Sequence, residues 1–96
     1  MTAQRTLTRI PPRGRRACVI RATRDDFASM SQVVKQVRIL AQLLDAPDYD
    51  PAIDRLKTTE AVRDLRRRGL IARTPYGYRA TSDGLNLLRA SEGHHA

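Results

Sequence analysis

Apolar side chains recur at helical spacing between residues 27 and 44. Alternating steps of three and four residues connect Phe27, Met30, Val34, Val37, Ala41 and Leu44. This spacing places the apolar side chains on one face of an α-helix, so we expect an amphipathic helix over residues 24–44. Thr23 and Asp26 resemble a capping box at its start, and Pro47 requires the helix to end before it.

A second helical region is expected after the acidic turn at residues 45–50. Asp50 followed by Pro51 is typical of a helix start, because the carboxylate accepts from free backbone N–H groups and proline suits the first helical position. Residues 51–57 are predicted to form a short helix, which either stops or continues into a third helix over about 58–68. Gly69 then ends that helix.

The spacing changes from helical to alternating after the third helix. Residues 70–74 and 78–81 are predicted strands, and the Pro-Tyr-Gly turn between them suits a tight hairpin. Thr81 or Ser82 is expected to cap a final short helix. The predicted fold class is therefore mainly α with a small β-hairpin.

The N-terminal end has a different composition. Residues 1–16 combine arginines with two adjacent prolines and a glycine, and we interpret them as a flexible basic arm. Residues 17–22 are a candidate for a short strand. The folded domain is expected to span residues 17–90, followed by a frayed tail over 91–96.

Length and composition exclude several classes of protein. A chain of 96 residues allows one domain, and no apolar run approaches the ~18 residues of a membrane span. Cys18 is the only cysteine, so no internal disulfide or cysteine-built zinc site is expected, and it is interpreted as a small buried hydrophobe rather than a redox-sensing thiol. His94 and His95 stand together at the C-terminus without convergent partners. We therefore expect no metal, no cofactor and no enzymatic activity.

Positive charge gathers in two blocks of the chain. The formal net charge is +8, and residues 1–24 contain arginines but no acidic residue. A second cationic block spans residues 55–79, while residues 45–54 carry four aspartates. Arginine blocks suit a polyanion, because they replace the counterions condensed on phosphate. This favours a cytoplasmic, nucleoid-associated protein that binds nucleic acid over a merely solvated surface.

The helices and the hairpin coincide with a local sequence pattern. It consists of Val62, Leu65, Gly69-Leu70-Ile71 and Arg73, followed by Tyr78-Arg79-Ala80-Thr81, Gly84 and Leu87-Leu88. The pattern resembles winged helix-turn-helix DNA-binding domains, most closely those of small prokaryotic, archaeal or phage transcription regulators. The resemblance implies a recognition helix at about 58–68 in the major groove of duplex DNA. It also implies a wing at 71–81 on the DNA backbone or minor groove.

Candidate DNA contacts come from the helix, the hairpin and the arm. Small polar side chains approach a phosphate or base edge, and arginines fork onto guanine or phosphate. The candidates are Thr58, Thr59, Arg63, Arg66 and Arg67 on the helix, Arg73 and Arg79 on one face of the hairpin, Tyr76 at its tip, and Arg13, Arg15 and Arg16 in the arm. Tyr78 is expected in the core. The alternative is a solvated helix face, in which Glu60 and Asp64 pair with Arg63 and Arg68.

The arm contains a short motif of its own. Pro12-Arg13-Gly14-Arg15-Arg16 resembles the AT-hook, in which glycine lets the backbone lie flat in an A·T-rich minor groove. Arg16 occupies the place where that motif has proline. The interpretations are minor-groove insertion and a nonspecific arm that binds phosphates. An organellar transit peptide is a weaker alternative, because the two prolines and the glycine break any amphipathic helix.

Three functions remain in competition. The first is a sequence-specific transcription regulator, the second an architectural DNA-binding protein with weak sequence preference, and the third a winged-helix module that docks a protein. A homodimer through the helix over 24–44 is also expected, because Val33, Leu40 and Leu43 widen its apolar stripe enough for a core and a partner. A dimer would place two recognition helices on successive major grooves.

Overall fold

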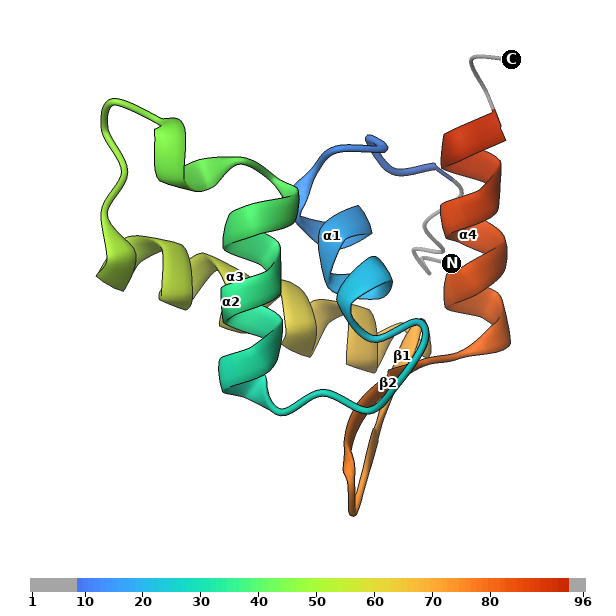
Figure 1. The fold of residues 1–96 in the computed structure, drawn as a ribbon. Coiled ribbons are helices and arrows are strands. Elements are labelled where there is room, and N and C mark those ends of the chain that lie inside the picture. The colour runs from blue at the N-terminus through green and yellow to red at the C-terminus, as the bar shows by residue number, and fades with distance from the viewer. Residues whose placement is uncertain (1–8, 94–96) are drawn as a thin grey trace, which may run out of the picture.

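The computed structural model describes residues 9–93, and Figure 1 shows how they are arranged. The elements in chain order are α1 (Arg15–Ala22), α2 (Met30–Leu40), the 3-10 helix η1 (Leu43–Asp45), α3 (Pro51–Arg67), β1 (Ile71–Thr74), β2 (Gly77–Ala80) and α4 (Ser82–Gly93). In Figure 1, α3 crosses behind α2, α1 lies between α2 and α4, and the hairpin projects away from the helices. The described chain is mainly helical with a small antiparallel hairpin, as the sequence predicted.

The segment at residues 17–22 is part of helix α1, so the strand expected there is wrong. Its apolar residues Ala17, Cys18, Val19 and Ile20 are all buried, because α2, α3 and α4 pack around α1. A short apolar run that is covered on every side shows neither helical nor alternating periodicity, so its pattern cannot distinguish helix from strand.

The expected boundary between arm and domain at residue 16 falls inside α1. Ile10 is only 3% exposed and belongs to the hydrophobic core, and Gly14 is the residue that precedes α1. Ile10 therefore anchors the segment before α1 to the domain, although residues 11–13 are exposed. Residues 1–8 of the expected arm, and residues 94–96 of the expected frayed tail, lie outside the described residues; the part of that tail at 91–93 continues α4.

Helix α2 is shorter than the helix expected over 24–44. It starts after Ser29, whose hydroxyl accepts from the Gln32 backbone while the Gln32 side chain accepts from the Ser29 backbone. Before that cap, Ala28 pairs with Tyr78 of β2 through two backbone hydrogen bonds of 3.0 and 2.8 Å. The capping box and this pairing favour extended backbone before Ser29, although the apolar spacing of residues 24–29 had predicted a helix there.

Helix α3 runs without a break from Pro51 to Arg67, so the second and third helices of the prediction are one helix. Its start is as predicted, because the Asp50 carboxylate accepts from the backbone N–H groups of Ala52 and Ile53. Its end is also as predicted. Gly69 adopts a φ of 76°, and the N–H of Leu70 donates to the carbonyl of Leu65 at 2.9 Å.

The hairpin and α4 close the fold at the end of α3. Thr74 pairs with Gly77 across a tight turn. The hairpin itself was predicted, but Gly77 is the first residue of β2 rather than part of the turn. Thr81 caps α4 by accepting from the Gly84 N–H, and its hydroxyl also donates to the carbonyl of Gly69 at 2.7 Å. A Cβ at Gly84 would lie 2.0 Å from the carbonyl oxygen of Leu70, so this close approach requires glycine.

Candidate nucleic-acid interface

Helix α3 has a buried face and an opposite face that is open to solvent. The buried face carries Asp54, Thr58, Ala61, Val62, Asp64 and Leu65. On the opposite face, steps of four and three residues align a row that we call the outer stripe, composed of Ala52, Leu56, Thr59, Arg63 and Arg66. All of its members are exposed except Thr59, which is half-buried. The outer stripe is the surface that α3 offers to a partner.

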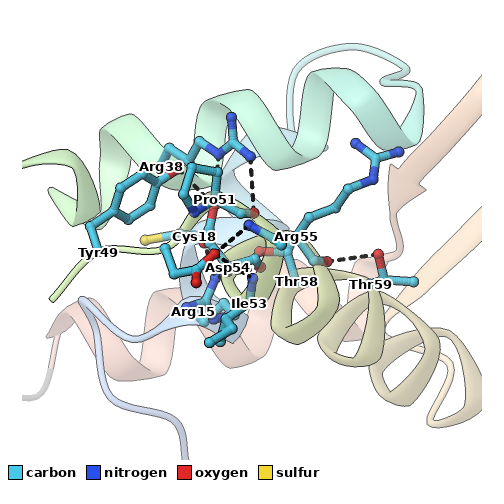
Figure 2. A network of polar contacts seen from close by, with 12 residues as sticks. Arg15, Cys18, Arg38, Tyr49, Pro51, Ile53, Asp54, Arg55, Thr58 and Thr59 are labelled. Carbon is cyan, nitrogen blue, oxygen red and sulfur yellow. Dashed lines mark hydrogen bonds and ion pairs between the residues drawn. The ribbon is translucent and has the colours of Figure 1, made fainter.

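A buried carboxylate fixes the first half of α3 against two other helices. Asp54 lies between Arg15 of α1 and Arg38 of α2, as Figure 2 shows, and both arginines donate to it. The Nε of Arg38 is 2.7 Å from the Asp54 Oδ2. Burial raises the pKa of Asp54, but the hydrogen bonds from Arg15 and Arg38 outweigh it and hold the pKa below its usual value.

A second buried carboxylate, that of Asp64, forms ion pairs with several arginines near the C-terminal end of α3. Asp64 accepts at 3.0 Å from Arg16 of α1, and from Arg67 and Arg68 of its own helix end. Burial raises the pKa of Asp64, and these hydrogen bonds outweigh it and lower the pKa. The sequence had suggested an i,i+4 pair between Asp64 and Arg68, and this pair is present.

These contacts separate the predicted site residues into two groups. Arg15, Arg16 and Arg67 form ion pairs with buried aspartates, although the side chains of Arg16 and Arg67 remain 47% and 75% exposed. Thr58 is 0% exposed and its hydroxyl accepts from Arg15 at 2.7 Å, so its expected place on the surface is wrong. The continuous helix explains the error, because Thr58 lies two turns inside α3 rather than at its start.

The second group consists of arginines that remain open to solvent. Within residues 9–93, no ion pair involves Arg63, Arg66, Arg73 or Arg13 of the predicted set, and all four are exposed. Arg55 has the same properties, but sequence reasoning did not single it out because the recognition helix was expected to begin at residue 58. A single long helix starting at Asp50-Pro51 would have placed Arg55 among the candidates.

The hydroxyl of Thr59, which the sequence suggested as a contact to phosphate or a base edge, is hydrogen-bonded within α3. It donates to the carbonyl oxygen of Arg55 at 2.8 Å, as Figure 2 shows. The proton of the hydroxyl is therefore already used within α3. Thr59 has no free donor to offer to a phosphate.

The hairpin presents its two arginines on opposite faces, which corrects the expected single face. Arg73 pairs with Tyr78 and Arg79 pairs with Ala72, and directly opposed residues of an antiparallel pair share a face. The Arg79 guanidinium lies 5.0 Å from the centre of the Phe27 ring. Tyr78 is half-buried and packs against the core, as predicted.

The tip of the hairpin is aromatic and exposed. Tyr76 is 78% exposed, and its ring lies 5.5 Å from that of Phe27. Phe27 therefore contacts both the tip and Arg79, although its spacing had assigned it to the long helix. These contacts hold the loop before α2 against the hairpin.

The remaining candidate groups are the thiol of Cys18 and the side chains that could bind a metal. Cys18 is fully buried, as predicted, and burial raises the pKa of its thiol. Within residues 9–93, no group of His, Cys, Asp and Glu side chains is arranged to hold a metal ion. No helix in that same part of the chain is long and apolar enough to cross a membrane.

Comparisons with known proteins found no relative. No family model, no curated protein and no solved structure matches this chain.

Proposed function

We propose that this protein binds duplex DNA sequence-specifically, as a small transcription regulator of the winged helix-turn-helix type. In this proposal α3 enters the major groove with its outer stripe, and the β1–β2 hairpin lies on the DNA backbone or minor groove. The observation that carries it is that α3 and the hairpin present exposed arginines without ion pairs among the described residues: Arg55, Arg63 and Arg66 on α3 and Arg73 on β1.

The pairing of the other arginines strengthens this proposal. Here Asp54 and Asp64 bind arginines on the inner side of α3, while the outer stripe keeps its guanidinium groups open. An open guanidinium can form a bidentate contact with guanine or phosphate without first breaking an ion pair.

The N-terminal segment has a smaller role than the AT-hook resemblance implied. Gly14 is followed directly by α1, and both arginines after it are paired with aspartates of α3. Arg13 is exposed and has no such partner among residues 9–93. We therefore assign to Arg13 a nonspecific contact with phosphate.

A homodimer is part of the same proposal, with a changed interface. Val33, Val34 and Val37 of α2 are already buried in the domain. The exposed apolar side chains of this region are Ile39, Leu40 and Leu44, at the end of α2 and in η1. A second copy of the chain would cover these residues rather than the whole helix.

The decisive experiment is selection of bound sequences from a random duplex library, followed by affinity measurements. We expect a defined consensus, with binding at least about 1000-fold tighter than to random duplex. Arg63→Ala is expected to cost about 1–3 kcal/mol on the consensus and less on random DNA. Arg89→Ala is the matched control, because Arg89 is an exposed arginine of α4 outside the outer stripe.

The outcome also distinguishes the competing functions. A ratio of consensus to random affinity below about ten would instead favour an architectural protein with weak sequence preference. Failure to bind any duplex at low salt would overturn the proposal in favour of a protein-docking module.

A further inference from the structure

The first half of the outer stripe is apolar, whereas its second half is cationic. Leu56 is 58% exposed and lies on the face of α3 that points away from the core. Ala52 precedes it by one turn and Thr59 follows it by one turn. The Thr59 hydroxyl donates to the carbonyl of Arg55 within α3. This half of the stripe has no free side-chain donor for a base edge.

Resting on the proposed function, we propose that this half of α3 recognises the C5-methyl groups of thymine in the major groove. Leu56 is the principal contact and Ala52 and Thr59 flank it. Thymine is the only base with a methyl group in that groove, and apolar side chains are its natural partners there. Arg63 and Arg66, farther along the same stripe, contact guanine or phosphate.

The charges beside Leu56 favour DNA over a second copy of the chain. Arg55 directly precedes Leu56, and Arg63 lies two turns farther along the outer stripe. Both are exposed, form no ion pair within the described residues, and outnumber Glu60, the exposed acidic residue one turn after Leu56. In a two-fold contact centred on Leu56, the same arginines of both copies would meet, and like charges would repel. Against DNA, the same arginines face phosphates. The apolar residue and its cationic neighbours thus fit one partner, a thymine-containing duplex.

The expected effect is modest but measurable. Burial of one methyl group is worth about 0.8 kcal/mol, which corresponds to a factor of about four in affinity. Deoxyuridine differs from thymidine only by lacking this methyl group. Replacing thymidine by deoxyuridine therefore isolates the methyl contact and leaves base pairing and the phosphates unchanged.

The test measures the affinity of the full chain for its selected duplex, with each thymidine replaced in turn by deoxyuridine. At one or two positions the wild-type protein is expected to lose about fourfold in affinity. Leu56→Ala is expected to bind the thymidine duplex more weakly and to lose the discrimination at those positions. If selection yields no consensus, a random duplex synthesised with thymidine or with deoxyuridine serves as the probe.

Ile53→Ala is the matched control, since Ile53 is also an exposed aliphatic residue of α3, at 52%, but lies outside the outer stripe and outside the proposed dimer contact. It should retain the full discrimination. Equal affinity of the wild type for thymidine and deoxyuridine at every position would overturn the inference and leave the proposed DNA-binding function intact. Conversion of a dimer into a monomer by Leu56→Ala would also overturn it, because Leu56 would then face a second copy. Absence of duplex binding would overturn both.

Discussion

The Nε of Arg38 on α2 donates a 2.7 Å hydrogen bond to the buried carboxylate of Asp54 on α3. The other oxygen of that carboxylate accepts from Arg15 of α1. One side chain, only 4% exposed as a residue, therefore joins three helices. This places the first turns of α3, and with them Leu56 and Thr59, relative to the rest of the domain.

Replacement of Asp54 by asparagine should strongly destabilise the fold. Asparagine keeps the size of the side chain but leaves two guanidinium groups without their counter-charge. Breaking a buried pair in this way costs about 3–5 kcal/mol, and the partial exposure of both arginines places the loss near the lower end. Urea unfolding measures it, with Asp48→Asn in the exposed loop as control. Equal midpoints for the two variants would show that the ion pairs contribute little.

Stability should fall as the solution becomes acidic. The pKa values of Asp54 and Asp64 are lowered by their arginine partners, although burial opposes the shift. As the pH falls, the unfolded chain therefore takes up these protons first, at about pH 4. The two aspartates stabilise the fold above that pH, and this stabilisation is lost as the pH falls through their lower pKa values in the folded state. Thermal unfolding between about pH 7 and 2 measures this dependence. A variant with both aspartates changed to asparagine should show a flatter profile; an equally steep one would contradict the assignment.

Gly84→Ala should disturb the packing of α4 on the end of α3. The added Cβ would lie 2.0 Å from the carbonyl oxygen of Leu70, and this backbone atom cannot move without displacing the turn. We expect a loss of about 1–3 kcal/mol in the free energy of unfolding. Gly93→Ala is the matched control in the same helix, because no atom lies within 4 Å of the added Cβ. A Gly84 variant as stable as this control would show that α4 can shift freely.

Arg73→Ala should weaken binding to all duplex sequences alike. Arg73 is exposed on the projecting hairpin and has no ion pair within residues 9–93, which suits a contact with phosphate. Loss of one such contact reduces the slope of log affinity against log salt by about 0.9. Affinities measured at several salt concentrations, for consensus and random duplexes, determine this slope. An unchanged slope would place Arg73 away from the DNA backbone.

The intact protein should form a dimer at micromolar concentration. Ile39, Leu40 and Leu44 are exposed apolar side chains near the end of α2, and a second copy would bury them. Sedimentation equilibrium at moderate salt measures the mass. Leu40→Glu should dissociate the dimer without unfolding the domain, because Leu40 is exposed. A mass of 10.8 kDa at all concentrations would exclude the dimer, and the selected DNA site should then lack two-fold symmetry.

The sequence by itself determined the features that depend on neighbouring residues. Asp50-Pro51 predicted the start of α3, Gly69 its end, residues 75–77 a tight turn, and Thr81 or Ser82 the cap of α4. Caps and turns are satisfied by backbone groups only a few residues away, so their signals are short and readable. The periodic apolar stripe likewise predicted a helix that contains α2, although not its true ends.

The tertiary structure decided which arginines belong to the domain and which remain available. Arg16 and Asp64 are 48 residues apart, and Arg15 and Asp54 are 39 apart, yet both pairs meet. Charge counted along the chain assigned Arg15, Arg16 and Arg63 to the same kind of site, because nothing local distinguishes them. Only packing of α1 against α3 pairs the first two with buried carboxylates, whose desolvation requires a counter-charge, and leaves Arg63 on the outer stripe.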